Sequence, residues 1–301
     1  MREDMLNFTA RFGKRRTKKQ KLKFLEFYMD VAGKLGYTAT LHKFKQGINT
    51  GLNIILGDLK AADVIFIADY DTRERVLLPG FRYSLTDEKR NLVFLRNNLL
   101  VYFAFSSLFI LAAVGVLWYS LRLSGAVRWA FTGCAMILGS LSFFTADGFS
   151  SRINTKKNSA LFLLFELMKE GMGKKRCFVI ADLSTFTGYG RAFFYKEYPL
   201  RGKKVVLLEN CATPGETFCV HSDNCSAKSL KALKEITDPP IFKEAPFSLA
   251  KEHGFEFYVL SLCDNADEPY IENYGNGEDA YFDGDAYNKI RQAALALHEH
   301  W

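Results

Sequence analysis

Cysteine and proline are both scarce in this chain, and no apolar segment lies at its beginning. The 301 residues include six cysteines and seven prolines. So few cysteines in a chain of this length exclude a small disulfide-stapled scaffold and indicate free thiols in a reducing compartment. The residues near Met1 contain no apolar run, so no secretory signal peptide is evident. The sequence also lacks internal repeats and low-complexity segments, so we expect a folded globular body.

The positive charge is unevenly distributed. The formal net charge is +7, and many of the cations lie between Arg11 and Lys23. Such a tract suits an anionic membrane surface or a nucleic acid. However, Thr17-Lys-Lys-Gln20 has the spacing of a helix capping box. We therefore interpret the tract as the exposed first turns of a helix and expect no nucleic-acid partner.

Charged residues are absent from several short apolar runs, which predict buried strands. These runs are 64–68, 177–181, 205–208 and 257–262. Apolar residues at helical spacing predict helices over 17–35, 159–168, 226–236 and 286–298. Strands that alternate with helices are typical of an α/β fold with a mainly parallel sheet covered on both faces.

Two carboxylates follow the first of these buried strands directly. Asp69 and Asp71 are spaced i, i+2, so their side chains leave an extended segment on the same face. The ends of strands are where α/β sheets keep their chemistry, so the pair could converge on one cation or one proton. Acidic residues after a strand also commonly open a solvated loop, and the pattern alone leaves both interpretations open.

Long uncharged segments interrupt the α/β pattern. Residues 99–121 contain no charged side chain over 23 positions, and residues 130–146 none over 17. A helix of about 20 apolar residues crosses the hydrocarbon core of a bilayer. We predict a two-helix transmembrane hairpin over 98–147, inserted between the halves 1–97 and 148–301 of one domain. Two buried core helices are the alternative.

The residues around the hairpin predict its orientation. Trp118 and Trp129 lie near its turn, and aromatic rings favour the membrane interface. More lysines and arginines lie beside the globular halves than beside the turn, and such an excess marks the cytoplasmic side. We therefore expect a protein of the cell membrane with two spans, the lipid bilayer as a partner and the globular body in the cytoplasm.

Taken in order, the chain resembles a bacterial, membrane-hairpin version of the zinc aminopeptidases of metallopeptidase family twenty-eight. The segments that carry the resemblance are Arg15–Lys21, Asn53–Asp58, Ala68-Asp69-Tyr70-Asp71-Thr72, Asn158-Ser159 through Glu166, Phe178–Gly190 and Tyr281-Phe282-Asp283. The resemblance implies a zinc-exopeptidase fold, related to phosphorylase- and hydrolase-like folds. In that family two zinc ions are bridged by a carboxylate and a water, and a glutamate is the general base.

The resemblance also implies that the zinc ligands are missing. The positions of the family's five metal ligands hold Asp69, Lys156, Thr185, Asn210 and Gly275. Ser184 stands in place of the glutamate base, Asp71 matches an aspartate that supports a ligand, and Asp279 matches the last motif. No register shift restores the set, because the chain has no Glu-Glu dipeptide and its five histidines lie elsewhere. We expect no metal, no cofactor and no catalytic residue.

Lys156 is the most informative of these changes, because an ammonium repels dications. We expect Lys156 to pair with Asp69 or Asp71 and so to replace the missing metal charge; a solvated lysine is the alternative. The expected cleft residues are Asp69, Asp71, Lys156, Asp182, Asn210 and Asp279.

Three functions are compatible with these features. The one we favour is a membrane-anchored, catalytically inactive relative of the aminopeptidases that binds a peptide or protein through the inherited cleft. The second is an atypical metallopeptidase or hydrolase with a rebuilt active site. The third is a structural subunit whose hairpin packs with other membrane helices.

Overall fold

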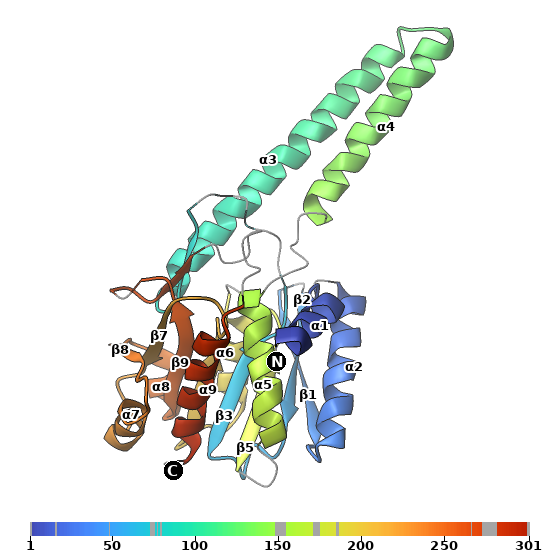
Figure 1. Cartoon of the computed structure of the whole chain (residues 1–301). Coiled ribbons are helices and arrows are strands. Elements are labelled where there is room, and N and C mark those ends of the chain that lie inside the picture. The colour runs from blue at the N-terminus through green and yellow to red at the C-terminus, as the bar shows by residue number, and fades with distance from the viewer. Residues whose placement is uncertain are drawn as a thin grey trace.

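The computed structural model describes residues 2–15, 17–47, 49–72, 76, 78, 80–147, 155–170, 175–184, 187–265, 267–272 and 282–299. Within these ranges, the body is a mixed sheet with helices on both faces, and a pair of long helices projects from it (Figure 1). The α/β class and the large, mostly parallel sheet expected from the sequence are confirmed.

The main sheet has eight strands among the described residues, in the order β1-β2-β5-β3-β6-β9-β7-β8. Their bounds are β1 (Ala39–Gln46), β2 (Asn49–Leu56), β3 (Val64–Asp69), β5 (Arg176–Ala181), β6 (Lys204–Leu208), β7 (Glu216–His221), β8 (Ile241–Glu244) and β9 (Glu256–Cys263). The four central strands β5, β3, β6 and β9 run parallel, while β1, β2 and β7 add antiparallel pairings. A smaller sheet pairs β4 (Arg82–Ser84) with β10 (Tyr270–Glu272).

Each face of the main sheet has its own apolar core. The helices are α1 (Arg2–Phe12), α2 (Lys18–Lys34), α5 (Thr155–Glu170), α6 (Tyr189–Glu197), α7 (Ala227–Lys234), α8 (Ser248–His253) and α9 (Gly284–Glu299). One core contains side chains of α1, α2, α5, α7 and α9, and the other contains side chains of α6 and α8. Alternate residues of β3 enter different cores, with Phe66 in one and Ile65 and Ile67 in the other. This alternation explains the continuous apolar run, because the strand is buried on both faces.

The first predicted helix begins as its sequence indicates. Thr17 Oγ1 accepts a hydrogen bond from the Gln20 amide (3.3 Å), and the Thr17 amide donates to Gln20 Oε1 (3.1 Å). These reciprocal bonds satisfy two amides that the start of a helix leaves without partners. The capping box at the start of α2 is therefore confirmed.

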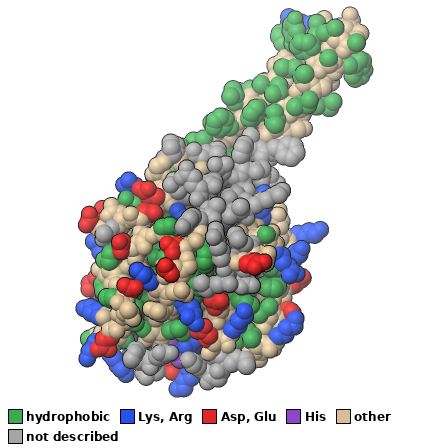
Figure 2. Space-filling model, viewed as in Figure 1, with side chains coloured by type: hydrophobic (Ala, Val, Ile, Leu, Met, Phe, Trp, Pro, Cys, Tyr) green, Lys and Arg blue, Asp and Glu red, His purple; other side chains and the backbone are tan. Residues whose placement is uncertain are grey.

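Helices α3 (Glu88–Ser120) and α4 (Gly125–Asp147) pack side by side and antiparallel (Figure 1). Large apolar side chains cover their outer surfaces, including Phe103 and Trp129, which are 68% and 75% exposed (Figure 2). Helix α3 begins before the uncharged segment, so the charged residues at 88–90 form its base. Within the described ranges, one helix, Lys89–Ser120, has the length and composition of a membrane span.

Candidate functional site

The polar residues expected at the site gather at one edge of the sheet. Asp69 ends β3, Asp182 follows β5, and Glu209 and Asn210 follow β6. Because these three strands are parallel neighbours, their carboxyl ends meet at the same edge. All four residues are at most 2% exposed, so side chains fill this part of the edge among the described residues.

A buried ion-pair network surrounds Asp69. Its Oδ2 atom lies 3.0 Å from Lys157 Nζ and 3.3 Å from Arg191 Nη1. The same Nη1 atom lies 3.1 Å from Glu209 Oε1. Helices α5 and α6 thus each supply one cation to carboxylates at the ends of β3 and β6. Asp69 serves as the shared anion of these ion pairs.

The lysine that pairs with Asp69 is Lys157, so the expected pairing of Lys156 with Asp69 is wrong, and the alternative pairing with Asp71 stays a prediction. Lys156 Nζ donates instead to the carbonyl oxygen of Glu272, the last residue of β10. Consecutive residues of an α-helix point about 100° apart, so only one of two adjacent lysines in α5 faces a given partner. Both lysines are buried, which excludes the solvated alternative for Lys156.

Asp182 and Asp71 hold a neighbouring part of the same edge. Asp182 pairs with Lys21 of α2 and accepts hydrogen bonds from the amides of Leu52 (3.2 Å) and Leu183 (2.9 Å). Asp71 Oδ1 accepts from the Ser184 amide (3.0 Å). These two carboxylates therefore fix the backbone around β2 and the segment after β5.

Ser184, which the sequence resemblance places at the general-base position, makes contacts within the fold. Ser184 Oγ donates to the carbonyl oxygen of Asp182 (3.0 Å) and accepts from the amide of Arg191 (3.0 Å). Its side chain is fully buried. The hydroxyl ties the turn after β5 to the first turn of α6, so it positions Arg191.

Asn210 likewise makes contacts within the fold. Its Nδ2 atom donates to Thr213 Oγ1 (2.5 Å) and to the carbonyl oxygen of Leu262 (2.9 Å), which links β6 to β9. Thr185, Gly275 and Asp279, the remaining expected positions, lie outside the described residues.

Arg15, in the N-terminal segment, contacts the residues that follow β3. This residue is fully buried, unlike the exposed basic tract that the sequence indicated. Its Nε atom donates to the carbonyl oxygen of Tyr70 (2.5 Å), its amide donates to Thr72 Oγ1 (2.7 Å), and its guanidinium lies 4.9 Å from the ring centre of Phe24. Burial lowers the pKa of Arg15 to about 10. One cation of the basic tract is therefore part of the interior.

The electrostatics of the edge follow from burial and close pairing. Burial raises the pKa of Asp69, although Arg191 and Lys157 act in the opposite direction. Burial also raises the pKa of Asp182, against the effect of Lys21. Although burial opposes it, Asp69 holds the pKa of Arg191 well above its ordinary value.

Among the described residues, cations at this edge are at least as numerous as carboxylates. The carboxylates are Asp69, Asp71, Asp182 and Glu209, and the cations are Arg15, Lys21, Lys156, Lys157 and Arg191. A site for two dications needs more carboxylate, thiolate or neutral imidazole ligands than cationic side chains. Among the described residues, no group of three or more His, Cys, Asp or Glu side chains could hold a metal ion. The donor set of the described residues does not fit zinc.

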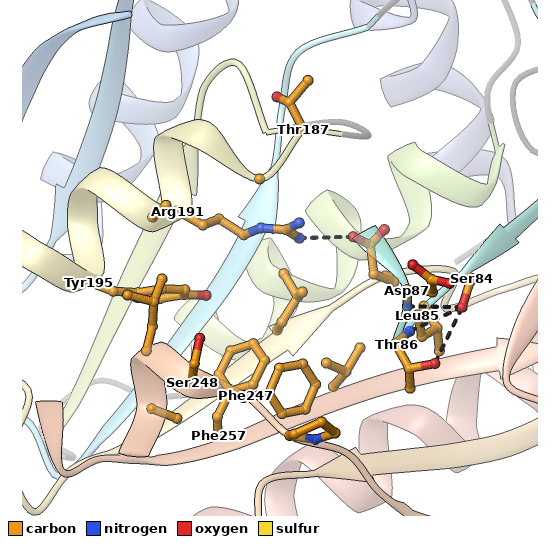
Figure 3. Close-up of a pocket in the computed structure, with 18 of the residues that line it drawn as sticks. Ser84, Leu85, Thr86, Asp87, Thr187, Arg191, Tyr195, Phe247, Ser248 and Phe257 are labelled. Atoms are coloured by element: carbon orange, nitrogen blue, oxygen red, sulfur yellow. Dashed lines mark hydrogen bonds and ion pairs between the residues drawn. The ribbon is translucent and has the colours of Figure 1, made fainter. Parts of the chain in front are cut away.

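A pocket of about 470 Å³ adjoins the network on the side of α6 and α8 (Figure 3). Arg191 and Glu209 form part of its wall, and Tyr195, Phe247 and Phe257 contribute aromatic rings. Residues 83–87 and Lys89, at the end of β4 and the start of α3, line the opposite side. The open volume beside the site is therefore displaced from the residues at which the sequence predicted a cleft.

Sequence reasoning missed the parts played by Arg191, Lys157 and the pocket. Glu209 directly follows a predicted strand, and that position was a usable signal. Arg191 belongs to a short helix with no motif, and its role depends on the distant residues Asp69 and Glu209.

No family model matches the sequence, and no curated protein sequence matches it. Solved structures do match its fold. A glutaminyl cyclase from Porphyromonas gingivalis has a TM-score of 0.61 at 11% identity, covering 99% of this chain and 96% of its own. A leucine aminopeptidase precursor from Bacteroides thetaiotaomicron has a TM-score of 0.57 at 10% identity, covering 98% and 94%.

A zinc aminopeptidase from Bacillus subtilis has a TM-score of 0.47 at 12% identity, and this chain spans 50% of its length while 83% of this chain is covered. The fold of this chain is similar to the folds of the leucine aminopeptidase precursor and the glutaminyl cyclase, and the sequence resemblance implied the aminopeptidase-like fold.

Proposed function

We propose that this protein is a membrane-anchored, catalytically inactive relative of the zinc aminopeptidases and glutaminyl cyclases, and that it binds a peptide or protein partner. The observation that carries the proposal is the buried network of Lys157, Asp69, Arg191 and Glu209. It occupies the edge of the sheet where α/β folds keep their reactive groups. In this proposal the internal ion pairs take the place of a metal centre, and the adjoining surface provides the binding role.

An enzyme with rebuilt chemistry at the same residues is less well supported. A general base or nucleophile must come within hydrogen-bond reach of its substrate. Asp69, Asp182 and Ser184 are at most 2% exposed, and each is bonded to groups of the fold. In the described part of the chain, these atoms are therefore shielded from a substrate.

Membrane anchoring is the second part of the proposal. Helix α3 has the length and apolar composition of a span. Helix α4 packs along it and exposes Met136 and Ile137, at 66% and 63%, as a helix in contact with lipid would. We propose that both helices cross the bilayer and that the body faces the cytoplasm, as the distribution of lysine and arginine favours.

The test combines zinc binding with activity. The purified full chain, supplied with zinc, cobalt or manganese, is assayed for release of N-terminal amino acids and for cyclisation of N-terminal glutamine. We expect no turnover and no stoichiometric zinc by elemental analysis. Turnover that Asp71→Ala abolishes and Asp30→Ala preserves would refute the proposal. Asp30→Ala is the matched control, because Asp30 belongs to an exposed pair with Lys34 on α2.

A further inference from the structure

The pocket beside the ion-pair network has one strongly aromatic end. The rings of Phe247 and Phe257 lie 4.6 Å apart in an edge-on arrangement. The ring centre of Tyr195 lies 5.3 Å from that of Phe255 and 5.7 Å from that of Phe257. All four residues line the pocket, which has the volume typical of sites for small molecules. Such a surface favours an aromatic ring, which gains edge and face contacts beyond its buried area.

Among the described residues that line it, the polar end of the pocket carries no excess charge. Its charged lining residues are Arg191 and Glu209, which pair with each other, and Asp87 and Lys89 at the start of α3. Arg191 already contacts two carboxylates, so an anionic ligand would find this cation occupied. An added charge would enter a wall that is balanced, and burying it without a partner is costly. These features favour an uncharged ligand.

One wall of the pocket is also the attachment of α3 to the body. Ser84 Oγ accepts a hydrogen bond from the Asp87 amide (3.1 Å), and Asp87 Oδ1 accepts from the Arg90 amide (2.9 Å). Asn91 then binds Ser84 twice, accepting from its amide (2.9 Å) and donating to its carbonyl oxygen (2.7 Å). This junction, residues 84–91, holds the first turn of α3 against β4. Ser84, Thr86 and Asp87 face the pocket (Figure 3).

We infer that the pocket binds an uncharged aromatic group and that its occupancy stabilises the junction of α3 with the body. The inference rests on the binding role proposed above, but not on the absence of zinc. A ligand in contact with both the aromatic end and residues 84–87 links α6 and α8 to the base of α3. Binding at the pocket is in this way transmitted to the long helix.

The binding test uses the full chain in lipid nanodiscs and N-acetyl-phenylalaninamide as the probe. Calorimetric titration is expected to show binding at least tenfold tighter than that of N-acetyl-alaninamide, which lacks the ring. Ala192→Trp fills the pocket from α6, and Ser248→Trp fills it from α8; each is expected to weaken binding at least tenfold. Lys196→Trp, on the exposed side of α6, is the matched control and is expected to bind normally.

The transmission test measures hydrogen exchange at amides 84–91 with and without the probe. We expect at least threefold slower exchange there in the wild type, and no change in Ala192→Trp. Equal affinity for the two probes, or undiminished binding in both filled variants that melt like wild type, overturns the pocket assignment. Normal binding without protection of 84–91 overturns the coupling.

A second pair of ligands identifies the source of the ring. A glycine- and serine-rich peptide with one internal phenylalanine binds more tightly than the amide if the ring belongs to a polypeptide partner, and no more tightly if it belongs to a free small molecule.

The pocket inference and the proposed function fail under different results. Metal-dependent turnover would refute inactivity and leave the pocket standing, whereas a failed pocket test leaves inactivity standing.

Discussion

Asp69 shows how the identity of single residues decides the character of the site. Its carboxylate lies between Lys157 and Arg191, and its side chain is 1% exposed. A buried anion is tolerated only where cations or hydrogen-bond donors compensate for the lost water. Since Asp69 Oδ1 has no hydrogen-bond partner, the two cations at Oδ2 provide most of that compensation.

Replacing Lys157 by methionine therefore tests the network. The variant leaves the buried carboxylate with one cation fewer, and we expect it to lower the free energy of unfolding by roughly 3 kcal/mol. Lys34→Met is the control, because Lys34 pairs with Asp30 at the surface with 73% and 60% exposure. The control should change stability by less than about 1 kcal/mol. Urea unfolding followed by circular dichroism measures both, and equal effects would show that the network contributes nothing beyond a surface pair.

The pH dependence of stability tests whether burial or pairing dominates at Asp69. Because burial raises the pKa of Asp69 in the folded state, the folded protein takes up this proton at a higher pH than the unfolded chain does. The stabilisation from this proton is present below the ordinary pKa and is lost as the pH rises through the raised value. Wild type should therefore gain stability relative to Asp69→Asn as the pH falls from 7 to 4. Denaturant midpoints across that interval measure the difference, and a loss relative to the variant would show that the cations dominate.

At the scale of elements, substitution by alanine is expected to have opposite effects on stability at two glycines in helices. A Cβ at Gly190, in α6, would lie 1.9 Å from the carbonyl oxygen of Asp182, while a Cβ at Gly33, in α2, would meet nothing within 4 Å. Gly190→Ala should cost about 1 to 3 kcal/mol, because helix or turn must shift. Gly33→Ala should stabilise by about 0.5 to 1 kcal/mol, because alanine loses less backbone freedom on folding. Thermal melts of the two variants provide the comparison; stabilisation by both would contradict the close packing of α6 against Asp182.

Regular local patterns made most elements predictable. The apolar runs gave β3, β5, β6 and β9 nearly to their ends, and the capping box gave the start of α2. Strands β7 and β8 were missed because polar residues interrupt their apolar pattern. The charged start of α3 was also missed, because its first turns resemble a loop in composition.

The candidate site was predictable only in outline. Its position at the strand ends followed from the chain, since Asp69, Asp182 and Asn210 each follow a buried run. Which lysine faces Asp69 depends on the rotation of α5, and the burial of Arg15 depends on contacts with Tyr70 and Thr72. Such tertiary contacts leave no local signal in the sequence.

At the scale of the whole molecule, the labelling of Cys134 tests whether α4 enters the bilayer. Cys134 lies on the exposed surface of the hairpin, whereas Cys177, Cys211, Cys219 and Cys263 are buried. In Cys225→Ser protein reconstituted in liposomes, a charged maleimide should label Cys134 at least tenfold more slowly than in the unfolded chain. Lipid excludes both the reagent and the thiolate that reacts with it.

Ser124→Cys in a Cys134→Ser, Cys225→Ser background is the control. Residue 124 is exposed in the turn between α3 and α4, so it should react rapidly when the reagent has access to its side of the membrane. Mass spectrometry of both proteins gives the rates. Equal labelling at positions 124 and 134 would place α4 in water.

The strand order has a consequence for how the protein is made. Strands β3 and β5 are neighbours, with Val64 opposite Arg176, yet α3 and α4 are synthesised between them. The ribosome therefore releases the entire hairpin before the centre of the sheet can close. For a chain whose hairpin enters the bilayer, insertion comes first and the body folds afterwards at the membrane surface. Until then β3 remains an unpaired edge, so slow insertion prolongs the period in which the nascent chain can aggregate.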